Sequence, residues 1–148
     1  MNAYQNSIFM NSQIVKKIQK NKLEELRICV LKNNMVDVRI YFYFPNDPEP
    51  KPTKKGIWLS FKNLPKIIEG FNGLVNDNSS ELSLEFEKSN TQKLKVYTQD
   101  FRNTKLVHLR TYYLKNEEYA PGRGVSFPIA LLKDVSDALK ESEKLKEE

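Results

Sequence analysis

Two strand-like segments carry an arginine and an aromatic residue at the same spacing, and each could bind an extended anion. The segments read Val-Asp-Val-Arg-Ile-Tyr-Phe at 36–42 and Val-His-Leu-Arg-Thr-Tyr-Tyr at 107–113. Arg39 and Arg110 supply the cations, and the two aromatic residues that end each segment supply flat rings. Single-stranded nucleic acid needs cations for its phosphates and exposed ring faces on which its bases stack. The two segments therefore favour binding of single-stranded nucleic acid.

A basic residue directly before a glycine follows each segment. Lys54 and Lys55 precede Gly56, and Arg123 precedes Gly124. A helical pattern comes next in both places, with a leucine eight residues past the glycine. Because the same features recur in the same order, the sequence predicts an internal duplication.

Strands and one helix are expected in each copy. The predicted strands cover 26–31, 35–44 and 56–60 in the first copy, and 82–86, 94–101, 106–114 and 124–127 in the second. The Ile8–Met10 region is the expected counterpart of the 82–86 strand. Ser60 is a predicted helix cap, and Pro128 is predicted to open the second helix. Gly70 and Gly73 are expected to end the first helix.

The expected architecture is α+β, with four strands and a helix occurring twice. Residues 1–75 form the first repeat, 76–80 a linker, and 81–148 a second repeat with an acidic C-terminal tail. A unit of about 70 residues buries only a small core. The two copies are therefore expected to pack together as one pseudo-symmetric body.

These motifs resemble the transcriptional coactivator family of positive cofactor four, over about 45 residues of each copy. The resemblance implies a curved four-stranded antiparallel sheet followed by a helix, and paired sheets that bind single-stranded DNA in two channels. Here one chain holds both halves, as an intramolecular pseudo-dimer. The site residues that the resemblance and the basic-aromatic pattern together indicate are Lys32, Arg39, Phe42, Lys54, Lys55, Gly56, Trp58, Phe101, Arg102, Lys105, Arg110, Tyr113, Arg123 and Gly124.

The two copies differ in their candidate residues. The second has an aromatic-basic turn, Phe101 and Arg102, where the first has Leu31 and Lys32. Alternation places Arg39 on the same strand face as Tyr41, whereas the family pattern points to Phe42; a bulge or a strong twist could reconcile the two. We expect the two binding surfaces to be unequal.

Several residues have two interpretations from sequence alone. Trp58 is either a stacking platform or part of the contact between the copies. His108 is expected to be an exposed strand residue, and Cys29 a small core residue. Arg39 and Arg110, taken as exposed, are expected to contribute little to stability. A run of four basic residues is expected to be a solvated segment, and phosphate binding is the alternative. The run consists of Lys16, Lys17, Lys20 and Lys22.

Composition excludes several classes of protein. The chain carries 24 basic and 19 acidic residues, a net charge of +5. A polyanionic partner would suit this charge, but on charge alone ordinary solvated lysine is the favoured explanation. The chain has one cysteine and one histidine, so neither disulfides nor a zinc site is expected. No nucleotide-binding glycine motif or nucleophile–histidine pair occurs, so no enzyme and no cofactor are expected. No apolar run is long enough to span a bilayer, and the N-terminus does not resemble a signal peptide.

The function predicted from sequence is binding of single-stranded DNA with little sequence specificity. The expected partners are unpaired DNA strands, RNA as a further ligand, and the transcription machinery. An intracellular location is expected, in the cytoplasm or nucleoid or, in a eukaryote, the nucleus. The alternative is a protein–protein interaction module or an RNA-binding protein that uses the same surface.

Overall fold

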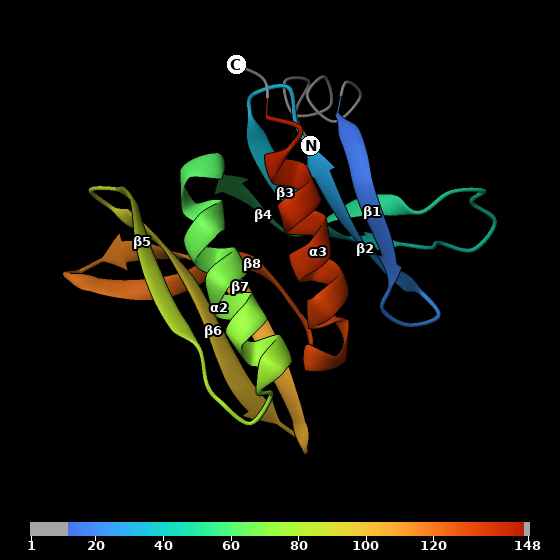
Figure 1. Cartoon of the computed structure of the whole chain (residues 1–148). Coiled ribbons are helices and arrows are strands. Elements are labelled where there is room, and N and C mark those ends of the chain that lie inside the picture. The colour runs from blue at the N-terminus through green and yellow to red at the C-terminus, as the bar shows by residue number, and fades with distance from the viewer. Residues whose placement is uncertain (1–11, 147–148) are drawn as a thin grey trace.

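Two four-stranded antiparallel sheets, each followed by a helix, make up the computed structural model (Figure 1). The structure describes residues 12–146, and no helix in this range is long and apolar enough to cross a membrane. The first sheet has the order β1-β2-β3-β4 and the second β5-β6-β7-β8. The elements are β1 (Gln13–Gln19), β2 (Glu24–Val30), β3 (Met35–Phe42), β4 (Lys51–Ser60), η1 (Phe61–Asn63), α2 (Leu64–Asn76), β5 (Ser83–Ser89), β6 (Gln92–Phe101), β7 (Thr104–Lys115), β8 (Glu118–Pro128), η2 (Ile129–Leu131) and α3 (Leu132–Glu143). The predicted α+β tandem arrangement is confirmed.

The two helices are exchanged between the sheets. Figure 1 shows α2 lying over the second sheet and α3 over the first, and α3 contacts β1 and β2. Phe71 of α2 packs edge-on against Phe127 of β8, with 6.4 Å between ring centroids. Between the helices, Ser136 donates a hydrogen bond to Asn72 at 3.1 Å. Each copy therefore completes its core with the helix of the other copy.

The first helix does not end at its glycines, so that prediction is wrong. Ser60 caps the η1 turn as expected, by accepting a hydrogen bond from the amide of Lys62. The helix then continues through Gly70 and Gly73 to Asn76. A Cβ at Gly70 would lie 2.8 Å from a methyl carbon of Leu82, so this glycine lets the helix approach the segment leading into β5.

The paired strands reproduce the repeat predicted from the motifs. Arg39 of β3 lies opposite Gly56 of β4, and Arg110 of β7 lies opposite Gly124 of β8. In both sheets the register shifts immediately after this pair. The extra residues lie on β4 and β8, so both copies have a bulge at the basic segment before the glycine.

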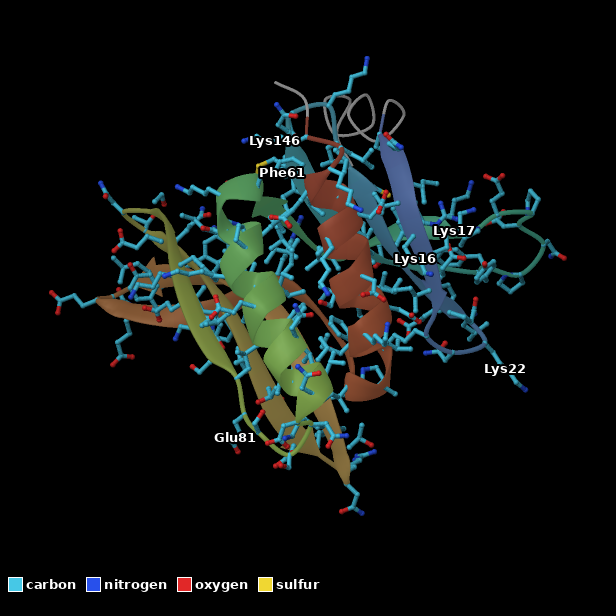
Figure 2. All side chains as sticks on the ribbon, viewed as in Figure 1. Lys16, Lys17, Lys22, Phe61, Glu81 and Lys146 are labelled. Carbon is cyan, nitrogen blue, oxygen red and sulfur yellow. The ribbon has the colours of Figure 1, made fainter. Side chains whose placement is uncertain are left out.

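The first strand comes later in the chain than expected. The Ile8–Met10 region lies outside the described residues, and β1 is the strand that corresponds to β5. Lys16 and Lys17 are exposed residues of β1, and Lys22 lies in the turn after it, with its side chain extending away from the sheet (Figure 2). The basic run is therefore partly an edge strand, not only a solvated segment.

The shared core predicts that the two copies unfold together. Buried side chains of both copies form one continuous cluster. Urea unfolding followed by fluorescence of Trp58, the single tryptophan, reports on the first copy and its contact with the second, while circular dichroism reports on all the secondary structure. We expect coincident transitions, as for a two-state domain. Two separated transitions would mean that the copies are independent.

Candidate nucleic-acid interface

A hollow of about 200 Å³ lies where the two copies meet, and it combines predicted site residues from both. We call it the junction pocket. Its lining residues are Arg39, Gly56, Ile57, Trp58, Lys88, Thr111, Tyr113 and Arg123. The pocket forms because β4 of the first sheet contacts β8 of the second. Arg39 therefore shares the pocket with Tyr113 of the other copy, and this accounts for the apparent mismatch between the arginine and the aromatic residue of a single strand.

The Arg39 side chain crosses directly over Gly56. A Cβ on Gly56 would lie 2.5 Å from Cζ of Arg39, closer than real Cβ contacts allow. The guanidinium also donates a hydrogen bond to the carbonyl oxygen of Thr53 at 2.7 Å. The glycine and the bulge thus fix the guanidinium beside the junction pocket.

A buried carboxylate pairs with Arg39. Nη2 of Arg39 lies 3.0 Å from Oδ1 of Asp37, and the Asp37 side chain is completely buried. The Arg39 side chain is itself only 13% exposed. The expectation that Arg39 is an exposed residue is therefore wrong. Because its loss would leave a buried carboxylate unpaired, we now expect it to contribute to stability.

Burial raises the pKa of Asp37 to about 6, although Arg39 and a hydrogen bond from Trp58 oppose the shift. The folded protein therefore binds this proton more tightly than the unfolded chain, whose carboxyl has an ordinary pKa of 3.8. The stability that this difference contributes is complete below about pH 4 and is lost as the pH rises to about 6. At about 1.4 kcal/mol per unit of pKa, it amounts to roughly 3 kcal/mol.

We expect this pH dependence to be absent from Asp37→Asn. The measurement is the free energy of unfolding in urea from pH 4 to pH 7, for the wild type and the variant. The difference between the two proteins should change by roughly 3 kcal/mol over this range, with the wild type losing stability as the pH rises. A constant difference would show that Asp37 titrates normally.

The equivalent arginine of the second copy has no carboxylate partner among residues 12–146. His108 takes the place of Asp37, and Nη1 of Arg110 makes only a long contact of 3.5 Å with the carbonyl oxygen of Gly122. Its Nε is buried without a hydrogen-bond partner among these residues. Of the two equivalent strand arginines, Arg110 is therefore the one whose charge no carboxylate neutralises among residues 12–146.

His108 is buried, so its predicted exposure is wrong. Its side chain is 7% exposed, stacks on Tyr97 with 4.8 Å between ring centroids, and lies 2.9 Å from Oε1 of Gln99. Burial and the nearby Arg110 lower its pKa. A neutral imidazole leaves the charge of Arg110 available for an external anion. Cys29 is buried, as predicted.

Tyr113 and Lys88 complete the side of the junction pocket that belongs to the second copy. A Cβ on Gly122 would lie 2.1 Å from Cε2 of Tyr113, so the glycine makes room for the ring. Lys88 donates a hydrogen bond to Oγ1 of Thr111 at 3.2 Å, and desolvation lowers its pKa. Lys88 was not predicted, because it lies outside both motifs.

The outer face of the second sheet carries basic and aromatic residues that the motif comparison missed. Lys95 lies over the ring of Tyr112 at 4.3 Å, and Lys93 lies over that of Tyr119 at 4.4 Å. The hydroxyls of Tyr97 and Tyr112 are 3.2 Å apart. A shallow hollow of about 430 Å³ is lined in part by Lys95, Tyr97 and Tyr112. Alternation of Lys93, Lys95 and Tyr97 along β6 was the signal that could have revealed this face.

The remaining predicted residues of the second copy lie at two different places. Phe101 and Arg102 form the exposed turn between β6 and β7, at the opposite end of β7 from Tyr113. Lys105 donates hydrogen bonds to the carbonyl oxygens of Asn78 and Ser80. Gly124 lies opposite Arg110, beside the junction. The structure therefore does not bring the aromatic turn to the junction pocket.

The remaining predicted residues of the first copy are also spread out. Lys54 and Lys55 are exposed in the β4 bulge next to Gly56. Lys32 lies in the β2–β3 turn, at the far end of β3 from Phe42. The ring of Phe42 contacts that of Phe44, with 4.8 Å between centroids. The structure therefore does not gather the predicted residues of the first copy at one place.

Comparisons with known proteins found one family model and a similar solved structure. The chain is similar to a solved structure, a PC4 homolog from Burkholderia pseudomallei, with 22% identity, 44% of this chain and 92% of that chain covered, and a TM-score of 0.40. No curated protein matches the chain. The family model described as Transcriptional Coactivator p15 (PC4) matches residues 86–138, from within β5 into α3. The second sheet and its helix are therefore the part of the chain that matches the PC4 family.

Proposed function

We propose that this protein binds single-stranded DNA, in the manner of a transcriptional coactivator, at the junction pocket and the basic surfaces beside it. The observation that carries the proposal is the composition of the pocket. Arg39 and Trp58 come from the first copy, and Tyr113 and Arg123 from the second. The match of residues 86–138 to the PC4 family supports the same ligand.

The chemistry favours single strands over duplex. Arg123 and Lys88 offer charges to phosphates, and Tyr113 and Trp58 offer ring faces that only an unstacked base can reach. Each stacked base contributes roughly 1–3 kcal/mol, and stacking is largely independent of base identity. Binding unpaired strands in this way would stabilise melted DNA.

One chain supplies both halves of the proposed site. Joining two units replaces a bimolecular association by an intramolecular one, at an effective concentration of the order of millimolar. We therefore propose that the working form is a monomer that acts as a pseudo-dimer. Contact with the transcription machinery is part of the same proposal.

Titrations with matched oligonucleotides test the function. We expect tighter binding to single-stranded than to duplex DNA, and an affinity for single strands that falls as salt increases, with a log–log slope of about −0.7 per phosphate neutralised. Single-stranded RNA in the same titration measures the preference between DNA and RNA. Equal or tighter binding of duplex DNA would contradict the proposal, and binding to none of the nucleic acids would favour a protein–protein module.

A further inference from the structure

A second hollow adjoins the junction pocket and has a different chemistry. We call it the Trp58 pocket; its volume is about 170 Å³. Its lining residues are Met35, Trp58, Ser60, Lys62, Asn63, Glu87, Lys88 and Leu94. Trp58 and Lys88 line both hollows, so the two are neighbours. A strand that passes through the junction pocket can therefore place one base in the Trp58 pocket.

The tryptophan ring is held in place by its surroundings. It packs against the buried pair Cys29 and Leu31, and its indole hydrogen-bonds to the buried carboxylate of Asp37. The residue is only partly buried, and its exposed part lines both hollows. A ring fixed in this way is a preorganised platform for stacking, because little side-chain entropy is lost when a base binds.

Two polar side chains of the pocket are available to a ligand. Glu87 makes no ion pair among residues 12–146, whereas Glu85, on the same strand, pairs with Lys93 and Lys95. Asn63 precedes α2, but its side chain makes no capping hydrogen bond. A free carboxylate repels phosphates, so Glu87 is unfavourable for a site that contacts only the backbone. It is favourable where a base presents N–H donors.

We propose that the Trp58 pocket selects a guanine base from the bound single strand; this inference rests on the proposed function. A carboxylate has two acceptor oxygens, and guanine is the DNA base whose Watson–Crick edge presents two adjacent N–H donors. Glu87 accepts both hydrogen bonds, the amide of Asn63 donates to O6, and the base stacks on Trp58. Lys62 and Lys88 hold the flanking phosphates.

Fluorescence of Trp58 reports directly on this pocket, because it is the single tryptophan of the chain. The probes are a short oligothymidylate and the same strand with one central guanine, inosine or adenine. We expect the guanine strand to bind roughly tenfold more tightly than oligothymidylate and to quench the fluorescence more strongly. Inosine lacks the 2-amino group, so it should lose most of this advantage. Glu87→Gln should abolish it.

Glu85→Gln is the matched control, because it removes the same charge from the same strand but lies outside the pocket. It is expected to bind all strands somewhat more tightly and to keep the preference for guanine. Absence of a guanine preference in the wild type, or its survival in Glu87→Gln, would overturn the inference while leaving single-strand binding intact. Failure to bind any of the strands would overturn the proposed function and this inference with it.

Discussion

Arg39→Ala should destabilise the protein by about 3 kcal/mol, whereas Arg110→Ala should cost less than about 1 kcal/mol. The two arginines occupy equivalent positions opposite a glycine, but only Arg39 pairs with a buried carboxylate, Asp37. Removal of one partner of a buried ion pair leaves an uncompensated charge, which is far more costly than loss of the pair as a whole. Urea unfolding of the two variants at neutral pH measures the difference.

A double variant identifies the cause. Asp37→Asn in the Arg39→Ala background removes the unpaired carboxylate, so part of the lost stability should return. If Arg39→Ala and Arg110→Ala unfold at the same urea concentration, the Arg39–Asp37 ion pair contributes no more to the free energy of unfolding than the contacts of Arg110. In that case the ion pair would not make the two copies differ in stability.

Tyr113→Ala should weaken binding of single-stranded DNA by about one order of magnitude or more. Its ring lines the junction pocket, and loss of one stacked base corresponds to roughly 1–3 kcal/mol. Phe42→Ala is the matched control, because Phe42 is the equivalent residue of the first copy and its ring already contacts Phe44. We expect a smaller loss for Phe42→Ala, measured by anisotropy with a labelled oligonucleotide.

Unfolding of both aromatic variants serves as a check on their folding. If Phe42→Ala weakens binding as much as Tyr113→Ala in folded protein, the two copies bind equally. The junction pocket would then not be the principal site.

The pairing of arginine with glycine could be predicted from the sequence, because the motif recurs and a strand alternates with a fixed period. The repeat aligns Arg39 with Arg110 and Gly56 with Gly124. In the structure, each arginine lies opposite the glycine of its own copy. The close contact between Gly56 and the Arg39 side chain could not be predicted, because it depends on the bulge in β4. A bulge has no distinctive signature in a single sequence.

Burial of Asp37 could not be predicted from its strand. An aspartate between two valines alternates onto the face opposite the core, and such a face is usually solvated. Here neighbours from β2 and β4, among them Cys29 and Trp58, cover it. The histidine at the equivalent position, His108, is buried by different neighbours, among them Tyr97 and Gln99.

The exchange of the helices between the two sheets could not be predicted from the sequence either. An amphipathic pattern shows that one face of a helix is buried, but not which sheet covers it. Residues of α2 such as Phe71 were correctly predicted to be buried, yet their contacts lie on the other copy. The junction pocket, by contrast, forms where β4 of the first sheet contacts β8 of the second.

The salt dependence of single-strand binding by Lys88→Ala/Arg123→Ala tests most directly whether the junction pocket holds the DNA. Both residues line the pocket, one from β5 and the other from the β8 bulge. The control is Lys133→Ala/Lys140→Ala, which removes the same net charge from exposed lysines of α3. Our account predicts that the log–log slope becomes less steep by up to about 1.4 for the pocket variant and stays unchanged for the control. Equal slopes for the two variants would contradict it.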